Sequence, residues 1–120
     1  MSRSPRLLIV DDEETVLHLL TEFFTSRGYV VCSADEEANC LAALDEFPDV
    51  RAVLLDLSVG GTDLLRQIKE KRPDIEVIMM TGHDDEALAK RSISLGAFDH
   101  LAKPFDLPML EKLVRACIDR

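Results

Sequence analysis

Short apolar runs alternate along this chain with longer amphipathic segments, and this alternation constrains the fold more than any other feature. The expected strands are Leu7–Val10, Tyr29–Cys32, Ala52–Leu55, Glu76–Met80 and His100–Ala102. Each run has the length of a buried strand. Strict alternation of strands with helices favours a parallel sheet that is covered by helices on both faces. The sequence therefore predicts an α/β fold.

The segments between these runs carry apolar residues at helical spacing. We expect helices over Glu14–Arg27 and Asp85–Leu95, a helix capped by Ser33 or Asp35, a helix that ends at Arg72, and a last helix through Ile118. The length of 120 residues fits one domain. We assign it to residues 1–120, with a flexible tail over residues 1–5.

The composition argues against several classes of function. With 14 basic and 23 acidic residues the net charge is −9, which disfavours direct binding to nucleic acid because such binding needs cations. No apolar run approaches the ~20 residues of a membrane span, and the start does not resemble a signal peptide. Cys32, Cys40 and Cys117 lack the spacing of a zinc or redox site and fit reduced thiols in the cytoplasm.

Candidate functional residues follow the ends of the expected strands. They are Asp11, Asp12, Asp56, Thr81 and Lys103. Parallel sheets bind ligands beyond the carboxyl ends of their strands. Three carboxylates placed there would repel one another, and a hard divalent cation such as Mg²⁺ together with a lysine would offset this repulsion. A cation, an ammonium and a hydroxyl around one carboxylate suit phosphoryl transfer to that carboxylate.

The order of these residues, with Thr81-Gly82 and Lys103-Pro104-Phe105, resembles a response-regulator receiver domain over essentially the whole chain. The resemblance implies a flavodoxin-like (βα)5 fold with strand order 2-1-3-4-5. It also implies a role in a two-component phosphorelay, with a phosphoryl group accepted from the phosphohistidine of a histidine kinase or histidine phosphotransfer protein. Such a domain is a signalling module rather than an enzyme, limited to self-catalysed phosphoryl transfer and autodephosphorylation.

The resemblance also assigns roles to single residues. Asp56 matches the phosphoacceptor, Thr81 the switch hydroxyl, and Lys103 the lysine that contacts the phosphoryl group. The family usually holds the bond before Pro104 in the cis form.

A Mg²⁺ site is implied by the same resemblance. Asp12 would bind the ion directly and Asp11 mainly through water. Asp56 and the backbone carbonyl of Ser58 would complete the set of ligands.

The chain departs from the family pattern after Asp56, where about three residues and a proline are missing. Gly60 and Gly61 can adopt the positive φ of a tight path. We expect the following helix to begin at Thr62–Leu64, one turn shorter than in relatives, and residues 57–61 to be mobile without metal.

Two histidines stand at positions with roles in the family. His100 replaces the aromatic switch residue of the last strand, and His83 follows Thr81 by two residues, where it would modulate dephosphorylation. The expected readout face, for a homodimer or a C-terminal output domain, comprises the fourth helix, the last strand and the last helix.

Two alternatives remain open from the sequence. A haloacid-dehalogenase-like phosphatase also uses an aspartate nucleophile, Mg²⁺ and a lysine, but it needs a second aspartate where this chain has Ser58. A degenerate receiver would act as an interaction or dimerisation module without phosphorylation.

Overall fold

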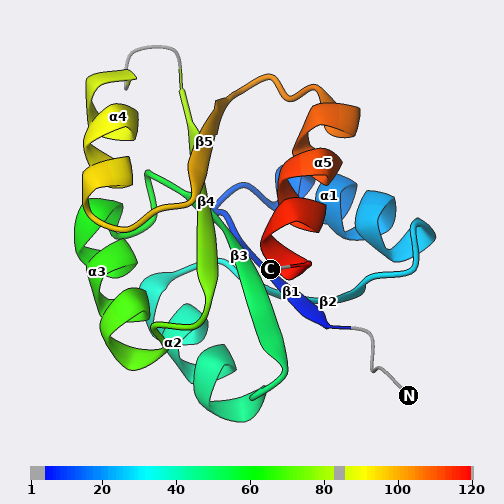
Figure 1. Ribbon diagram of the computed structural model, residues 1–120. Helices are drawn as coiled ribbons and strands as arrows, with labels where there is room; N and C mark the ends of the chain where they lie inside the picture. The colour runs from blue at the N-terminus through cyan, green and yellow to red at the C-terminus, as the bar shows by residue number, and fades with distance from the viewer. Residues whose placement is uncertain (1–4, 83–85, 120) are drawn as a thin grey trace.

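Parallel strands form one sheet between two layers of helices (Figure 1). The computed structural model describes residues 5–82 and 86–119. Within these ranges five strands lie in the order β2-β1-β3-β4-β5. Their bounds are β1 (Arg6–Val10), β2 (Val30–Ala34), β3 (Val50–Asp56), β4 (Glu76–Thr81) and β5 (Asp99–Ala102). The expected fold class and strand order are confirmed.

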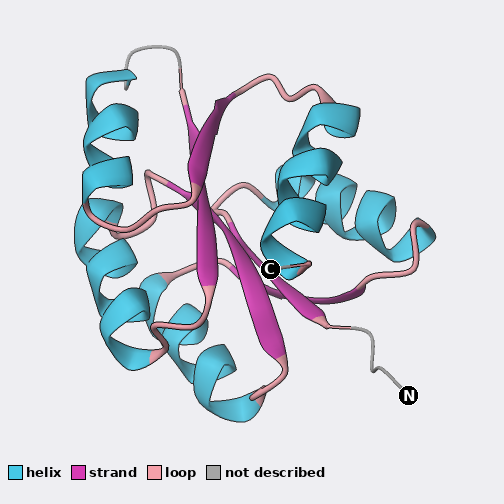
Figure 2. Cartoon of the chain, in the orientation of Figure 1, coloured by secondary structure: helices cyan, strands magenta, loops and turns pink. Residues whose placement is uncertain are grey.

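Helices cover both faces of the sheet, as Figure 2 shows. Their bounds are α1 (Glu14–Ser26), α2 (Glu37–Glu46), α3 (Gly61–Lys71), α4 (Glu86–Ser94) and α5 (Leu107–Ile118). Helices α1 and α5 pack on one face, and α2 and α3 pack on the other, with α4 beside α3. The connections are short, so each strand end leads directly into a helix.

Alternation of side chains along each strand builds two cores. In β1, Leu7 and Ile9 pack against α1 and α5, whereas Leu8 and Val10 pack against α2 and α3. These central strands are apolar on both faces because helices cover both. The carboxyl ends of all the strands in this parallel sheet therefore lie along the same edge.

The start of α2 differs from the expectation. Strand β2 continues through Ala34 because it pairs with β1 as far as Val10, so Ser33 lies inside the strand. The residue before α2 is Glu36, with no side-chain cap. Asp35 instead accepts a hydrogen bond from the side chain of Asn39 at 3.0 Å. The expected cap at Ser33 or Asp35 is thus wrong.

The β3–α3 connection is a tight hydrogen-bonded turn. Helix α3 begins at Gly61, one residue before the expected range, and Gly60 precedes it with φ of +73°. The amide of Gly61 donates to the carbonyl of Leu57 at 3.1 Å, and that of Leu64 donates to the carbonyl of Gly60 at 3.2 Å. The left-handed residue at position 60 starts the helix without a side-chain cap at Thr62.

The N-terminal tail and the cysteines were also the subject of predictions. Of the expected flexible tail, residues 1–4 lie outside the described residues, and Pro5 immediately precedes β1. Cys40 and Cys117 are buried, Cys32 is half-buried, and none of these three described residues is in a disulfide. In the described part of the chain, no helix combines the length and apolar character needed to cross a membrane.

Candidate functional site

The strand order brings three acids to one point at the carboxyl edge of the sheet. Asp11 directly follows β1, and Asp56 is the last residue of the adjacent β3. Carboxylate oxygens from Asp11, Asp12 and Asp56 all lie within 4.8 Å of one another. Asp11 and Asp56 are buried, whereas Asp12 is exposed. The cluster expected from the sequence is therefore present.

Lys103, just beyond β5, places its ammonium group among these acids. Its Nζ atom lies 2.9 Å from Asp11 Oδ2, 3.3 Å from Asp56 Oδ2 and 3.4 Å from Glu13 Oε1. The backbone N–H of Lys103 donates to the carbonyl of Thr81 at 2.7 Å, which ties the lysine to the end of β4. The bond between Lys103 and Pro104 is cis, as the resemblance implied.

The charges of this cluster are not balanced by the protein. Three carboxylates against one ammonium leave two negative charges in excess. Burial raises the pKa of Asp11, although hydrogen bonds from Glu13 N–H and Lys103 oppose this rise. Burial opposes the charge of Lys103, but Asp11 and Asp56 outweigh it and raise its pKa to about 12. Lys103 therefore stays protonated at neutral pH, and the site still attracts a further cation.

Two side-chain contacts were not foreseen from the sequence. The Ser58 hydroxyl donates to Asp56 Oδ2 at 2.8 Å and lies 3.4 Å from Asp12 Oδ1. Glu13, the residue before α1, reaches Lys103. The only signal in the sequence was the place of each residue, one or two positions beyond an acid of the cluster.

The other candidate residues are Thr81, His100 and His83, and the structure describes the first two. Thr81 is the buried last residue of β4, one position beyond Met80, which pairs with Asp56 in the sheet register. His100 is half-buried in β5 and pairs with Met79, so it lies on the sheet face covered by α2 and α3. His83 lies outside the described residues.

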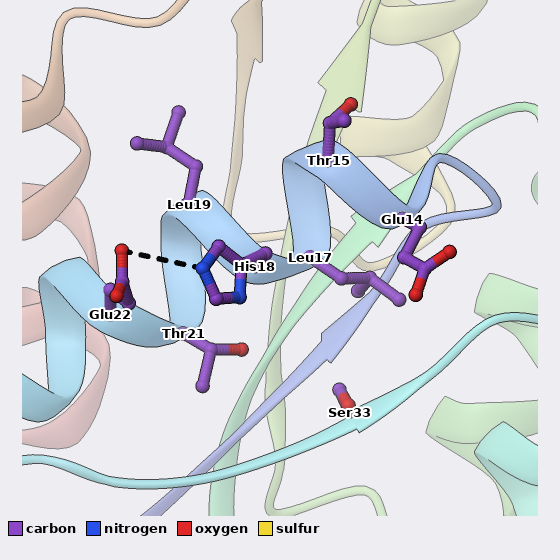
Figure 3. Close-up of a pocket in the computed structure, with 8 residues that line it drawn as sticks. All are labelled: Glu14, Thr15, Leu17, His18, Leu19, Thr21, Glu22 and Ser33. Carbon is purple, nitrogen blue, oxygen red and sulfur yellow. Dashed lines mark ion pairs between the residues drawn. The ribbon is translucent and has the colours of Figure 1, made fainter.

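A groove runs along α1, with Ser33 of β2 in its lining (Figure 3). It has a volume of about 670 Å³. Its lining residues are Glu14, Thr15, Leu17, His18, Leu19, Thr21, Glu22 and Ser33. Leu19 is 49% exposed, and His18 faces Glu22 one turn further along α1 at 3.6 Å. The groove thus combines an exposed apolar side chain with the acids Glu14 and Glu22, and it shares Glu14, Leu17 and Ser33 with a neighbouring pocket that Asp12 lines.

The family model of the response regulator receiver domain matches residues 7–115. The chain belongs to this family. A solved receiver-domain structure from Clostridium thermocellum superposes with a TM-score of 0.91 and 30% identity, over 97% of this chain and 95% of that one. The receiver domain is a module of two-component signalling, so the phosphatase alternative is not supported.

Similar curated proteins differ in length. The receiver domain is 38% identical over 117 residues to sporulation initiation phosphotransferase F of Bacillus subtilis, across 92% of this chain and 90% of that protein. It is 36% identical over 114 residues to the DNA-binding transcriptional regulator NtrC of Escherichia coli, across 92% of this chain and 24% of NtrC. It also spans about half of the acid tolerance regulatory protein ActR of Sinorhizobium medicae, at 38% identity.

Proposed function

We propose that this receiver domain accepts a phosphoryl group on Asp56 from a phosphohistidine donor in a Mg²⁺-dependent reaction. The observation that carries the proposal is the set of groups around Asp56. A protonated lysine, a serine hydroxyl and two further carboxylates converge on it. Retention of all these groups favours a phosphorylated receiver over a degenerate one.

The chemistry follows from these groups. One carboxylate oxygen of Asp56 forms a bond to phosphorus while the phosphorus–nitrogen bond of the donor breaks. The electron pair of that bond stays on the departing imidazole nitrogen, and the product is an acyl phosphate on Asp56. Lys103 neutralises part of the charge on the transferring group. Thr81, at the end of β4, supplies the hydroxyl that responds to the phosphoryl group.

The donor set fits Mg²⁺. Hard divalent cations prefer carboxylate and carbonyl oxygens, and the cluster holds two uncompensated negative charges. Asp11, Asp12, Asp56 and the Ser58 carbonyl would hold the ion, with Asp11 acting mainly through water. When bound, Mg²⁺ neutralises charge on the phosphoryl oxygens and so lets an anionic donor approach the acids.

Partners are inferred from the exposed apolar side chains. The groove along α1, with exposed Leu19, adjoins the pocket that Asp12 lines, and this supports α1 as the docking site of a phosphohistidine donor such as a histidine kinase or histidine phosphotransfer protein. A separate set comprises Leu88 and Ile93 on α4 and Met109 on α5, which are 44%, 41% and 45% exposed. This second set supports α4, β5 and α5 as the face that a second copy or an output domain reads.

Intact-mass spectrometry tests the proposal. The chain is incubated with acetyl phosphate and Mg²⁺, and we expect one added phosphoryl group. The adduct should be absent in Asp56→Asn, which preserves the size of the side chain and removes the nucleophile. An adduct that persists in Asp56→Asn would assign the phosphoryl group to another residue, and no adduct in the wild type would favour the degenerate module.

A further inference from the structure

We infer that the hydroxyl group of Ser58 positions the nucleophile Asp56, a role separate from that of the Ser58 backbone carbonyl. The inference rests on the proposed function, because it assigns a positioning residue to the same reaction. Ser58 engages both carboxylate oxygens of Asp56. Its backbone N–H donates to Oδ1 at 3.2 Å, and its Oγ donates to Oδ2 at 2.8 Å.

The short β3–α3 turn sets the direction of the Ser58 side chain. Leu57 and Val59, on either side of Ser58, are both buried in the core that faces α2 and α3. With both neighbours held in the core, the side chain of Ser58 extends toward the acids. The amide of Val59 also donates to the carbonyl of Asp56 at 2.9 Å, which closes the turn directly behind the nucleophile.

The far end of this turn is also held in place. A Cβ atom at Gly60 would lie 2.6 Å from Leu64 Cβ and 3.2 Å from side-chain carbons of Glu37 on α2. Glu37 in turn accepts a hydrogen bond from the side-chain amide of Gln67 on α3 at 3.1 Å. The turn is therefore packed against two helices, and it holds Ser58 at a defined place beside Asp56.

The hydroxyl acts on the orientation of the carboxylate. A serine hydroxyl has one hydrogen to donate, and the shorter contact assigns it to Asp56 rather than to Asp12. Without this hydrogen bond, Oδ2 of Asp56 would keep, within the described part of the chain, only the contact with Lys103 at 3.3 Å. Oδ1 would still accept from the backbone N–H of Ser58, so the carboxylate plane would be less firmly restrained and could tilt toward the lysine. Because in-line attack requires a defined carboxylate plane, the loss of this restraint slows the reaction.

The test distinguishes the role of the Ser58 hydroxyl from that of the Ser58 backbone carbonyl. Ser58→Ala removes the hydroxyl but keeps the carbonyl, and Ser58→Thr keeps both. Ser26→Ala is the matched control, since Ser26 is an exposed serine at the end of α1, away from the acids. The rate of phosphorylation is measured as a function of the acetyl phosphate concentration. The affinity for Mg²⁺ is measured by calorimetry. The ¹³C shift of the Asp56 carboxyl is recorded without metal.

We expect Ser58→Ala to lower the maximal rate about tenfold, with the half-saturating donor concentration and the Mg²⁺ affinity unchanged. Its Asp56 carboxyl signal should shift, whereas that of Ser26→Ala should not. Ser58→Thr should restore most of the rate. A normal maximal rate in Ser58→Ala, or a loss only of Mg²⁺ affinity, would overturn this inference alone. A wild-type chain that takes up no phosphoryl group would overturn the proposed function as well.

Discussion

The ammonium nitrogen of Lys103 lies 2.9 Å from Asp11 Oδ2 but 3.3 Å from Asp56 Oδ2. Lys103 is thus paired more closely with a candidate metal ligand than with the candidate phosphoacceptor. Among the described residues, Lys103 is the only basic side chain within ion-pair distance of these acids. The two acids after β1 therefore have different surroundings, because Asp11 has a cationic partner at 2.9 Å and Asp12 lies 3.4 Å from the hydroxyl of Ser58.

Substitution of these two acids should change stability in opposite directions in metal-free buffer. Asp12→Asn removes an exposed charge that repels its neighbours, so the free energy of unfolding should rise by up to about 1 kcal/mol. Asp11→Asn removes a buried partner of Lys103 and should lower it by about 1–3 kcal/mol. Urea unfolding with and without Mg²⁺ measures both effects, and both variants should gain less from Mg²⁺ than the wild type. Equal shifts in the two variants would contradict this view of the cluster.

Alanine at Gly60 should destabilise the domain more than alanine at the adjacent Gly61. Both glycines have positive φ, at +73° and +56°. A Cβ atom at position 61 would meet nothing within 4 Å, whereas one at position 60 would meet Leu64 and Glu37. We expect a loss of about 1 kcal/mol for Gly61→Ala from backbone strain alone, and a loss of more than about 2 kcal/mol for Gly60→Ala. Chemical denaturation measures the free energy of unfolding of both variants. Similar losses would show that the turn rearranges to accommodate a Cβ atom at position 60.

The same turn bears on the expectation that residues 57–61 are mobile without metal. Amide exchange of these residues with and without Mg²⁺ tests it. The hydrogen bonds of Val59 and Gly61, together with the burial of Leu57, lead us to expect measurable protection in the metal-free state. Rapid exchange that slows only with Mg²⁺ would support the original expectation of a mobile loop.

The thiols of Cys32 and Cys40 should react slowly in the folded protein. Burial raises the pKa of Cys32 to about 11 and that of Cys40 to about 12. At pH 8 only about one Cys32 side chain in a thousand is then a thiolate, the form that reacts with iodoacetamide. Mass spectrometry of alkylated protein should show slow labelling of both in native buffer and fast labelling in urea.

The same pKa shifts make stability depend on pH in the alkaline range. Both folded pKa values lie above the ordinary thiol value, so the unfolded chain loses these protons first as the pH rises. The stabilisation is full below about pH 8.5 and declines as the pH approaches 11 to 12. A Cys32→Ala/Cys40→Ala variant should show a smaller decline in free energy of unfolding, and an identical decline would exclude these thiols as the cause.

Phosphorylation should change the structure most in α4, β5 and α5. His100 lies in β5 on the sheet face covered by α2 and α3 and is half-buried, so it can respond to a movement at the end of β4. Amide chemical-shift changes on phosphorylation should concentrate in these elements. His100→Ala should reduce the changes in α4 without altering the phosphorylation rate from acetyl phosphate. Unaltered changes in α4 would remove His100 from the readout.

The sequence was informative where local pattern decides the structure. The strands could be located because short, continuous apolar runs such as Leu7–Val10 are typical of strands that helices bury on both faces. The acids Asp11 and Asp56 could be grouped because parallel strands share one carboxyl edge. By contrast, the contact of Ser58 with Asp56 depends on the path of the β3–α3 turn, whose Gly60 has no room for a side chain beside Leu64 and Glu37. Helix α3 begins at Gly61 after the left-handed Gly60 and has no side-chain cap, so local capping signals could not locate its start.

The sheet order also has a consequence for how the chain folds. Lys103 and Asp11 are 92 residues apart in the sequence, and Lys103 and Asp56 are 47 residues apart. Their meeting requires the pairing of β1 with β3, of β3 with β4, and of β4 with β5. Such long-range parallel pairings form late because loop closure costs entropy before any contact is gained. A chain in which β5 has not yet joined β4 therefore lacks Lys103 beside the acids, and the ability to take up a phosphoryl group would report that β1, β3, β4 and β5 have assembled.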